Sequence, residues 1–321
     1  MRAARCGLGE FGFKLIACAF MTIGHMRMFD QGLPDQYAWI GRMALPMFLY
    51  QVGCGCRYAR SKRNYVLRLY AAGVVMSIIN VVFKFPENIF PVLLNVAVIL
   101  CILRVEDKRR KLRYMVGYVV WQAGIFALAS VLQTLITMIS GNWTIAGNVG
   151  HIVAALGGFA ASGDYGLFVI AFGVAMGLCG SKLHLSVTFL IFSLVDVLMQ
   201  SIYGILLFLV PQLTMHHISN ESVANLRYLL FSNDMVMLVG TDGLLSEGLL
   251  WAALPALFFI LLYGGRRNRW AGVGAEAGPA LVGGVARWFF YAYYPLHFAV
   301  LALVGSRWPA VAAASFAGVI F

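Results

Sequence analysis

Long apolar runs recur along this chain, and a short polar or basic stretch separates each run from the next. A backbone inside a bilayer has to satisfy its own hydrogen bonds, so apolar runs of about 20 residues fold there as helices. With 61% hydrophobic and 12% charged residues, the composition lies outside that of soluble globular domains. We expect an all-α fold, a polytopic transmembrane helical bundle of nine to ten spans. The expected spans are Phe11–Phe29, Tyr37–Cys56, Leu69–Phe83, Ile89–Val105, Tyr114–Ser140, Leu167–Gly180, His184–Val210, Gly248–Gly264 and Trp288–Val304, followed by a short apolar end from Pro309 to Phe321.

The basic residues indicate how the bundle is oriented. Cytoplasmic loops of membrane proteins carry an excess of Lys and Arg. A cytoplasmic N-terminus places 18 of the 24 Lys and Arg residues on the inner side, in stretches that include Arg57–Arg68, Arg104–Arg113, Lys182 and Arg266–Arg287. The net charge of +11 is therefore explained by membrane topology. We expect membrane lipid as a partner and no nucleic acid. Met1–Glu10 places Arg2 and Arg5 ahead of an apolar run, as a signal peptide does, but no small-residue cleavage site follows, so we expect a retained first helix.

The loops expected outside carry few basic residues. Gly141–Tyr165 has no Lys or Arg, and Pro211–Glu247 contains only Arg227. Within the second loop, Ala224–Val239 is apolar enough for a re-entrant or amphipathic element. The Gly- and Ala-rich segment Ala271–Ala286 is expected to be a cytoplasmic loop. Because no repeat or interdomain linker stands out, we expect residues 1–321 to form a single domain.

Three ionisable residues fall inside the first two expected spans: Lys14, His25 and Arg42. A Lys or Arg at the centre of a span costs roughly 2.5–3.5 kcal/mol on insertion scales, so such residues usually face a wet cavity or a partner. Lys14 and His25 are about three helical turns apart, which puts both on nearly the same face, with His25 about 16 Å nearer the outside. Arg42, early in the second span, is expected at a depth similar to that of His25. Snorkelling of both cations and simple packing of His25 remains an open alternative.

Asp196 and Gln200 lie one turn apart in the seventh expected span, and Asp196 is a candidate counter-ion for Lys14 or Arg42. A polar contact between helices explains the same pair equally well. Cysteine spacing indicates neither a disulfide framework nor a metal cluster, and we expect no metal.

Three blocks of sequence resemble the TraX family of bacterial membrane proteins, in the same order. The first runs from Phe13 through Ile40–Phe48 to Leu69, the second begins at Asp164-Tyr165-Gly166, and the third is Phe290–His297. The family is named for a protein that acetylates the N-terminus of pilin. It is more distantly similar to transmembrane acyltransferases, in which a basic residue and a histidine separated by ten residues mark the first helix. The resemblance implies a multi-pass protein of the bacterial cytoplasmic (inner) membrane.

The implied activity is transfer of an acetyl or other acyl group from cytoplasmic acyl-CoA to an amine or hydroxyl acceptor. A protein N-terminus or a glycan at the outer face is the implied acceptor. His25 is the candidate base, because histidine commonly takes up a proton near neutral pH. Arg42 is a candidate for stabilising the oxyanion, or else a structural partner of an acid or a helix C-terminus. Candidate donor-binding residues are Lys14, Arg57, Arg60, Arg63 and Arg266, and topology alone is the alternative explanation for the loop arginines among them.

Tyr294 and His297, in the third block, are further candidates, and His297 is expected either to bind acceptor or to satisfy the backbone that Pro295 interrupts. The sequence departs from the family at one point. TraX-like sequences typically carry an acidic residue just before the first-helix histidine, whereas this chain has Gly24. The competing functional hypotheses are a transporter or flippase that uses the intramembrane charges as a pathway, and a non-catalytic partner of an envelope assembly system.

Overall fold

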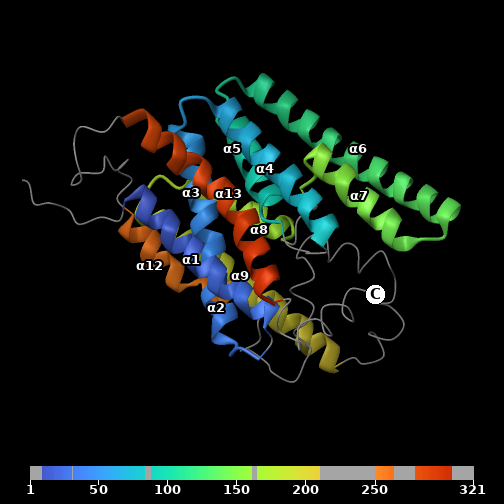
Figure 1. The fold of residues 1–321 in the computed structure, drawn as a ribbon. Helices are drawn as coiled ribbons and strands as arrows, with labels where there is room; N and C mark the ends of the chain where they lie inside the picture. Colours follow the sequence, from blue (N-terminus) through green and yellow to red (C-terminus); the bar gives the residue numbers. More distant parts are fainter. Residues whose placement is uncertain are drawn as a thin grey trace, which may run out of the picture. The chain divides into compact units, whose positions relative to one another are not determined.

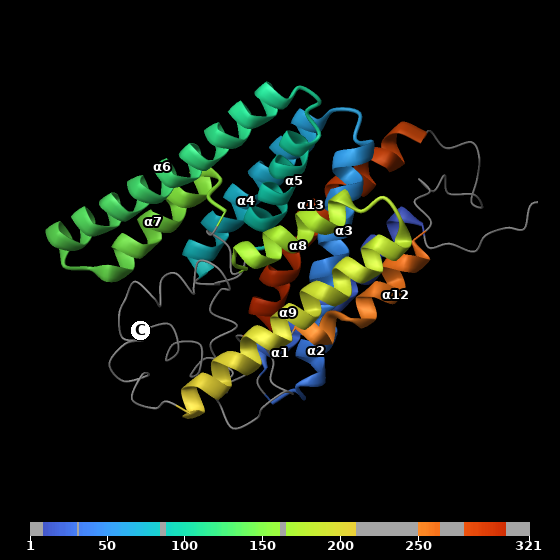
Figure 2. The same cartoon turned by 180° about the vertical axis from the view of Figure 1, so that it is seen from behind.

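The computed structural model describes residues 9–30, 32–83, 88–160, 165–209, 250–263 and 279–305. Their regular structure is helical (Figures 1 and 2), which confirms the all-α class. Ala224–Val239, Arg266 and the apolar end from Pro309 lie outside the described residues. The helices are α1 Glu10–Phe29, α2 Gln36–Arg42, α3 Ala44–Tyr58, α4 Lys62–Phe83, α5 Phe90–Leu103, α6 Lys108–Ser140, α7 Trp143–Gly157, α8 Leu167–Leu178, α9 Lys182–Leu209, η4 Leu250–Ala253, α12 Pro255–Leu262 and α13 Pro279–Gly305.

Two helices within the described residues are long and apolar enough to cross a membrane, Lys62–Val82 and Lys108–Ser140. Phe90–Leu103 and Leu167–Leu178 are shorter apolar helices. At 1.5 Å rise per residue, α6 is about 50 Å long, compared with about 30 Å for the hydrocarbon core of a bilayer. The expected number of nine to ten spans stays a prediction.

The chain divides into two compact units, which are described separately. The first unit comprises Met1–Phe48, Phe189–Val197 and Leu244–Phe321, and the second comprises Leu49–Thr188 and Leu198–Gly243. The first therefore contains α1, α2, α12 and α13, and the second contains α4 to α8. Helices α3 and α9 each contribute residues to both units. The single-domain expectation stays a prediction.

In the first unit, α1 is the central helix. It packs against α2 and α13, and its Phe13 and Phe20 contact Tyr263 and Phe259 at α12, with ring centroids 5.1 and 5.3 Å apart. Phe13 is fully buried. The residues of α1 thus face protein on more than one side.

The second expected span is wrong in one respect, because it is two helices. α2 ends at Arg42, Met43 forms a turn, and α3 begins at Ala44. Pro46 accounts for the break: it has no N–H to donate to the Arg42 carbonyl, and its ring clashes with that carbonyl in a continuous helix. Arg42 is consequently the last residue of a short helix.

In the second unit, α5 is the buried centre, packed against α4, α6 and α8. Its polar residue Asn95 is 1% exposed and fully hydrogen bonded. The Nδ2 group donates to the carbonyls of Pro91 and Gly158, and Oδ1 accepts from the hydroxyl of Tyr118 and from Gln122. Buried polar groups in helical membrane proteins are found in such satisfied networks.

The expectation of a loop over Gly141–Tyr165 is wrong, because α7 occupies Trp143–Gly157. Figures 1 and 2 show α7 lying beside α6 in both views. The Asn142 side chain caps its first turn, and Gly158 ends it with φ 65°. Its buried face carries small residues at four-residue spacing, Ala146, Gly150 and Ala154, which let two helices approach closely. The glycines and alanines that made this stretch look like a loop thus form the packed face of a helix.

Helix α7 ends beside the middle of α6. The Gly157 carbonyl accepts from the Trp121 indole and the Gly158 carbonyl accepts from Gln122, whereas α6 itself runs from residue 108 to residue 140. Tyr70 donates to the carbonyl of Leu156. The chain resumes as α8, which packs along α5 and ends near Arg104. Together, α7 and α8 return the chain to the end at which α6 begins, as two short helices in succession.

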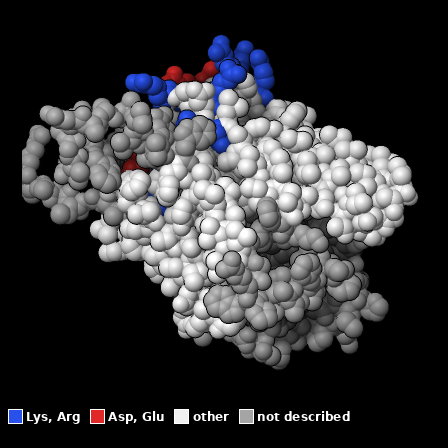
Figure 3. All heavy atoms as spheres, in the orientation of Figure 1, with Lys and Arg blue, Asp and Glu red and all other residues white. Residues whose placement is uncertain are grey.

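Lys and Arg gather at one edge of the face in Figure 3, and most of that face carries neither. The first turn of α6 supplies exposed basic residues, Lys108, Arg109 and Arg110, with Asp107 capping the helix by accepting from two backbone amides. Two stretches expected as inner loops are therefore largely helical: α4 already begins at Lys62 and α6 at Lys108. The expected loop Ala271–Ala286 is likewise helical from Pro279 onward.

Candidate functional site

One face of α1 packs along α13. Its residues recur at spacings of three and four, as expected for one helical face. The contacts pair Phe11 and Lys14 with Phe290, Thr22 with Tyr293, His25 with His297, and Phe29 with Phe298. Lys14 and His25 therefore share a face of α1, and that face is covered by the third of the sequence blocks.

The centre of this contact is a pair of histidines. Nδ1 of His25 lies 2.7 Å from Nε2 of His297, a hydrogen bond between residues 272 positions apart in the sequence. Nδ1 of His297 lies 3.1 Å from the Tyr293 carbonyl, one turn earlier in α13. His25 is 9% exposed and His297 6%. The histidine predicted as the base and the histidine of the last block are thus in direct contact.

Aromatic rings enclose the pair. The Phe298 ring is 4.5 Å from the ring of His25 and 4.6 Å from that of His297, and Tyr294 meets both imidazoles edge-on. Tyr293 stacks on His297 with an interplanar angle of 8°. Tyr294 and Phe298 are buried. Packing of this kind limits ring rotation, so the two imidazoles are held in one relative orientation.

Thr22 and Tyr293 were not predicted as site residues. Their hydroxyl oxygens lie 2.7 Å apart, and Thr22 also donates to the Cys18 carbonyl of its own helix. A hydroxyl that donates to its own helix is common in membrane helices. If Thr22 donates to Cys18, Tyr293 is the donor to Thr22. This bond ties the ring that stacks on His297 to α1.

Gly24 meets Gly41 where α1 crosses α2. A Cβ built on Gly24 would lie 2.5 Å from the Cα of Gly41, far closer than the 3.5–4.0 Å of ordinary carbon contacts. An acidic side chain therefore does not fit at position 24 in this packing. Since His25 and Arg42 directly follow these two glycines, the crossing brings their backbones to a similar level.

Arg42 is the last residue of α2, where a cation interacts favourably with the helix dipole, and its structural role stays a prediction. Its role in stabilising an oxyanion stays a prediction.

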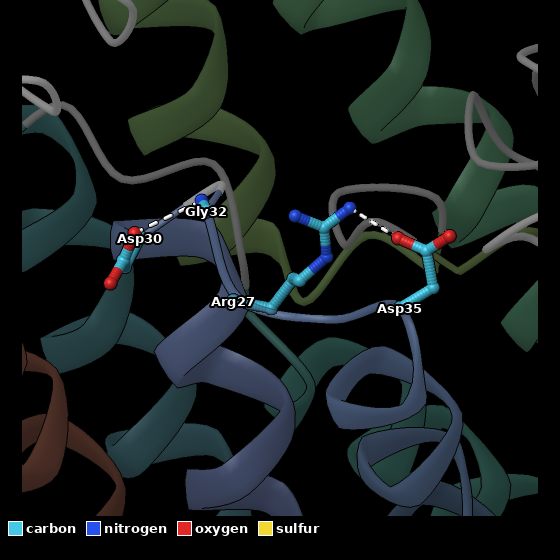
Figure 4. A network of polar contacts seen from close by, with 4 residues as sticks. All are labelled: Arg27, Asp30, Gly32 and Asp35. Atoms are coloured by element: carbon cyan, nitrogen blue, oxygen red, sulfur yellow. Dashed lines mark hydrogen bonds and ion pairs between the residues drawn. The ribbon is translucent and has the colours of Figure 1, made fainter.

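Arg27, a residue not singled out from the sequence, joins the two helices of this hairpin. Figure 4 shows its guanidinium directed at the carboxylate of Asp35, just before α2, with which it forms an ion pair. In the same turn the Asp30 side chain accepts from the Gly32 amide at 3.0 Å (Figure 4). These contacts assign Asp30 to the turn rather than to the orientation of His25.

Lys14 pairs with Glu10, one turn earlier in α1. Nζ donates to Oε1 at 2.7 Å, and the same ammonium lies 5.4 Å from the centroid of the Phe290 ring. The Lys14 side chain is 27% exposed. The ion pair involves Glu10, whereas Asp196 had been considered from the sequence. Asp196 is fully buried in α9.

Arg57, Arg60 and Arg63 belong to the second unit. Arg57 donates to the carbonyl oxygens of Gly177 and Cys179 at 3.5 and 3.1 Å, and Arg104 donates to the Gly177 carbonyl at 3.1 Å. Both thus cap the C-terminus of α8. Arg60 and Arg63 are exposed. Among the described residues, no group of three or more His, Cys, Asp or Glu side chains is arranged to hold a metal ion.

Comparison with known families bears on the first half of the chain. The family profile described as TraX protein matches residues 12–153, which contain α1 to α6 and most of α7. The resemblance to TraX is confirmed over these residues. No curated protein and no solved structure matches the chain significantly.

Proposed function

With residues 12–153 matching TraX as the premise, we propose that this protein is a membrane acyltransferase that uses His25 as its base. Acyl transfer from a thioester requires a group that removes the proton of the attacking amine or hydroxyl. The observation that carries the proposal is the buried hydrogen bond between His25 and His297. An imidazole whose other nitrogen is hydrogen bonded and whose ring is fixed by packing meets the requirement for a positioned base.

The donor is acetyl-CoA or a related acyl-CoA, the acyl donor that the resemblance implies. Lys14 supports this assignment, since its ammonium stands on the same face of α1 as His25, about 16 Å away along the helix axis. A cation in that position can bind a phosphate of the donor. The phosphate would then replace Glu10 as the partner of Lys14. The acceptor is an amine or hydroxyl at the outer face of the membrane, on a protein N-terminus or a glycan.

Arg42 is proposed to stabilise the oxyanion that forms when the acceptor attacks the thioester. This proposal rests on its backbone level beside His25 at the crossing of Gly24 and Gly41. Oxyanion stabilisation by one donor typically contributes about 10²–10³ in kcat. Removal of Arg42 is expected to lower kcat by that amount, while a purely structural Arg42 would lower the stability of the hairpin instead.

Thiol release from acetyl-CoA tests the proposal. Wild-type protein in lipid nanodiscs is incubated with acetyl-CoA and a peptide bearing a free N-terminal amine, and free CoA is measured. We expect His25→Ala to lower the rate by about 10²–10⁴, the contribution typical of a general base. His151→Ala is the matched control, because His151 is an exposed histidine of α7. Equal rates for wild type and His25→Ala would remove His25 from the mechanism.

One observation favours the alternative of a transporter. Helices α7 and α8 are two short helices in succession, and short or interrupted helices often line the substrate sites of transporters. Binding of acyl-CoA separates the two hypotheses. A wild-type protein that neither binds acetyl-CoA nor releases CoA, with peptide or lipid-linked sugar present, would favour transport.

A further inference from the structure

The protonation of the His25–His297 pair follows from the groups at its ends. A backbone carbonyl oxygen can only accept a hydrogen bond. The contact of 3.1 Å between the Tyr293 carbonyl and Nδ1 of His297 therefore requires a hydrogen on that nitrogen. In a neutral imidazole the other nitrogen then carries the lone pair. Nε2 of His297 is thus the acceptor in its contact with His25.

The same reasoning extends to His25. Because Nε2 of His297 accepts, Nδ1 of His25 donates across the 2.7 Å contact. A neutral His25 consequently carries its lone pair on Nε2. Two successive hydrogen bonds, from His25 to His297 and from His297 to the Tyr293 carbonyl, select one of the two tautomers of each ring. Free histidine has no such constraint, and the nitrogen that is protonated depends on the partner of the other.

The surroundings keep the chain of bonds in place. His297 is held between the stacked ring of Tyr293 and the ring of Phe298, and it is 6% exposed. Tyr293 is itself hydrogen bonded to Thr22 of α1. A flip of the His297 ring would place carbon atoms where nitrogen now meets the carbonyl and His25. Both hydrogen bonds would then be lost inside a buried site, where an unsatisfied polar group is costly.

We propose that His297 is a positioning residue that holds His25 in its Nδ1–H form, so that Nε2 is the basic atom. The inference rests on the proposed acyl transfer for its catalytic meaning. In the reaction, the acceptor's N or O forms a bond to the acyl carbon, and its proton passes to Nε2 of His25. The bond from carbon to sulfur then breaks, and the same proton goes to the CoA thiolate. Nδ1–H of the His25 imidazolium continues to donate to His297, which stabilises the charge.

Nitrogen NMR of histidine tests the assignment without any substrate. The full-length protein is labelled with ¹⁵N-histidine in nanodiscs, and His25→Gln and His297→Gln assign the two signals. We expect His25 to be protonated at Nδ1 and unprotonated at Nε2. In His297→Gln the amide oxygen can accept from Nδ1, so the tautomer should persist. In His297→Phe the side chain at position 297 offers no acceptor, and we expect the population of His25 with Nε2–H to rise.

Kinetics of the same variants give the functional readout. We expect His297→Phe to lower kcat by about 10–100-fold, by analogy with the loss found when the group that orients a metal-ligating histidine is removed, with KM for acetyl-CoA changed less than twofold. His297→Gln should restore most of kcat. If His297 had a structural role alone, both variants would lose stability. The value of kcat would then not depend on whether residue 297 can accept a hydrogen bond.

The outcomes separate the two proposals. A wild-type His25 with its proton on Nε2 overturns the positioning inference, as does a His297→Phe variant that keeps His25 in the Nδ1–H form. A wild-type protein with the expected tautomers that transfers no acyl group overturns the proposed function instead. Loss of folding in His297→Phe is recognised by the remaining histidine signals, and in that case the comparison of wild type with His297→Gln still decides the tautomer.

Discussion

Substitution of Gly24 tests the close crossing of α1 and α2 on which the position of His25 depends. In Gly24→Ala the new Cβ would meet the Cα of Gly41 at 2.5 Å, and an ordinary contact requires 3.5–4.0 Å. The obstacle is backbone, so the helices themselves must separate by about 1 Å. Overpacking of this kind costs about 1–3 kcal/mol. It exceeds the gain of about 1 kcal/mol that Ala brings to a helix relative to Gly.

The assay is the free energy of unfolding in mixed micelles, followed by tryptophan fluorescence as SDS is increased. Gly117→Ala and Gly124→Ala are matched controls, because both glycines lie inside α6 and a Cβ on either would meet nothing within 4 Å. We expect the controls to be neutral or stabilised by up to about 1 kcal/mol. We expect Gly24→Ala to destabilise the protein and to lower the rate of CoA release. We expect Gly24→Glu to destabilise it further.

Equal stability of Gly24→Ala and the α6 controls would refute the reasoning, because it would mean that the two helices do not approach as closely as described. An active Gly24→Glu variant would have the same consequence. It would also show that this chain accepts the acidic residue that TraX-like sequences typically carry.

Two further predictions concern the second unit. Arg57→Ala and Arg104→Ala should each destabilise the protein but not additively, because both arginines donate to the Gly177 carbonyl. A double-mutant cycle in the free energy of unfolding measures this coupling. A rise in KM for acetyl-CoA in Arg57→Ala alone would instead assign Arg57 to binding of the donor. Asn95→Leu should destabilise the protein by about 1–3 kcal/mol, because it leaves several buried partners unsatisfied. Tyr118→Phe removes one hydrogen bond and should cost about 0.6 kcal/mol. Equal losses of unfolding free energy in the two variants would contradict the network.

Much of the helical order was predictable from the sequence, because long apolar runs have few alternatives. The first expected span, Phe11–Phe29, differs by one residue from α1. The interruption at Met43 was also signalled, by Pro46, but the apolar run around it concealed the signal. Helix α7 was missed because glycines and alanines dilute its hydrophobic pattern, although those same residues form its buried face.

The candidate site was only partly predictable. Helical phase was enough to put Lys14 and His25 on one face, since that relation is local. The contact of His25 with His297 was not predictable from spacing, because 272 residues separate the two and only the packing of α1 on α13 joins them. The partners Glu10 of Lys14 and Asp35 of Arg27 were within reach of local spacing and were passed over.

The short helix α7 has a consequence for the order in which the helices of the second unit assemble. At 15 residues it is about 22 Å long, less than the hydrocarbon thickness of about 30 Å. Its last carbonyls depend on Tyr70, Asn95 and Trp121 for donors, and each such group left bare in lipid is worth several kcal/mol. Helix α7 should therefore form late, after α4, α5 and α6 have packed together, because these three helices supply the donors that its last carbonyls need.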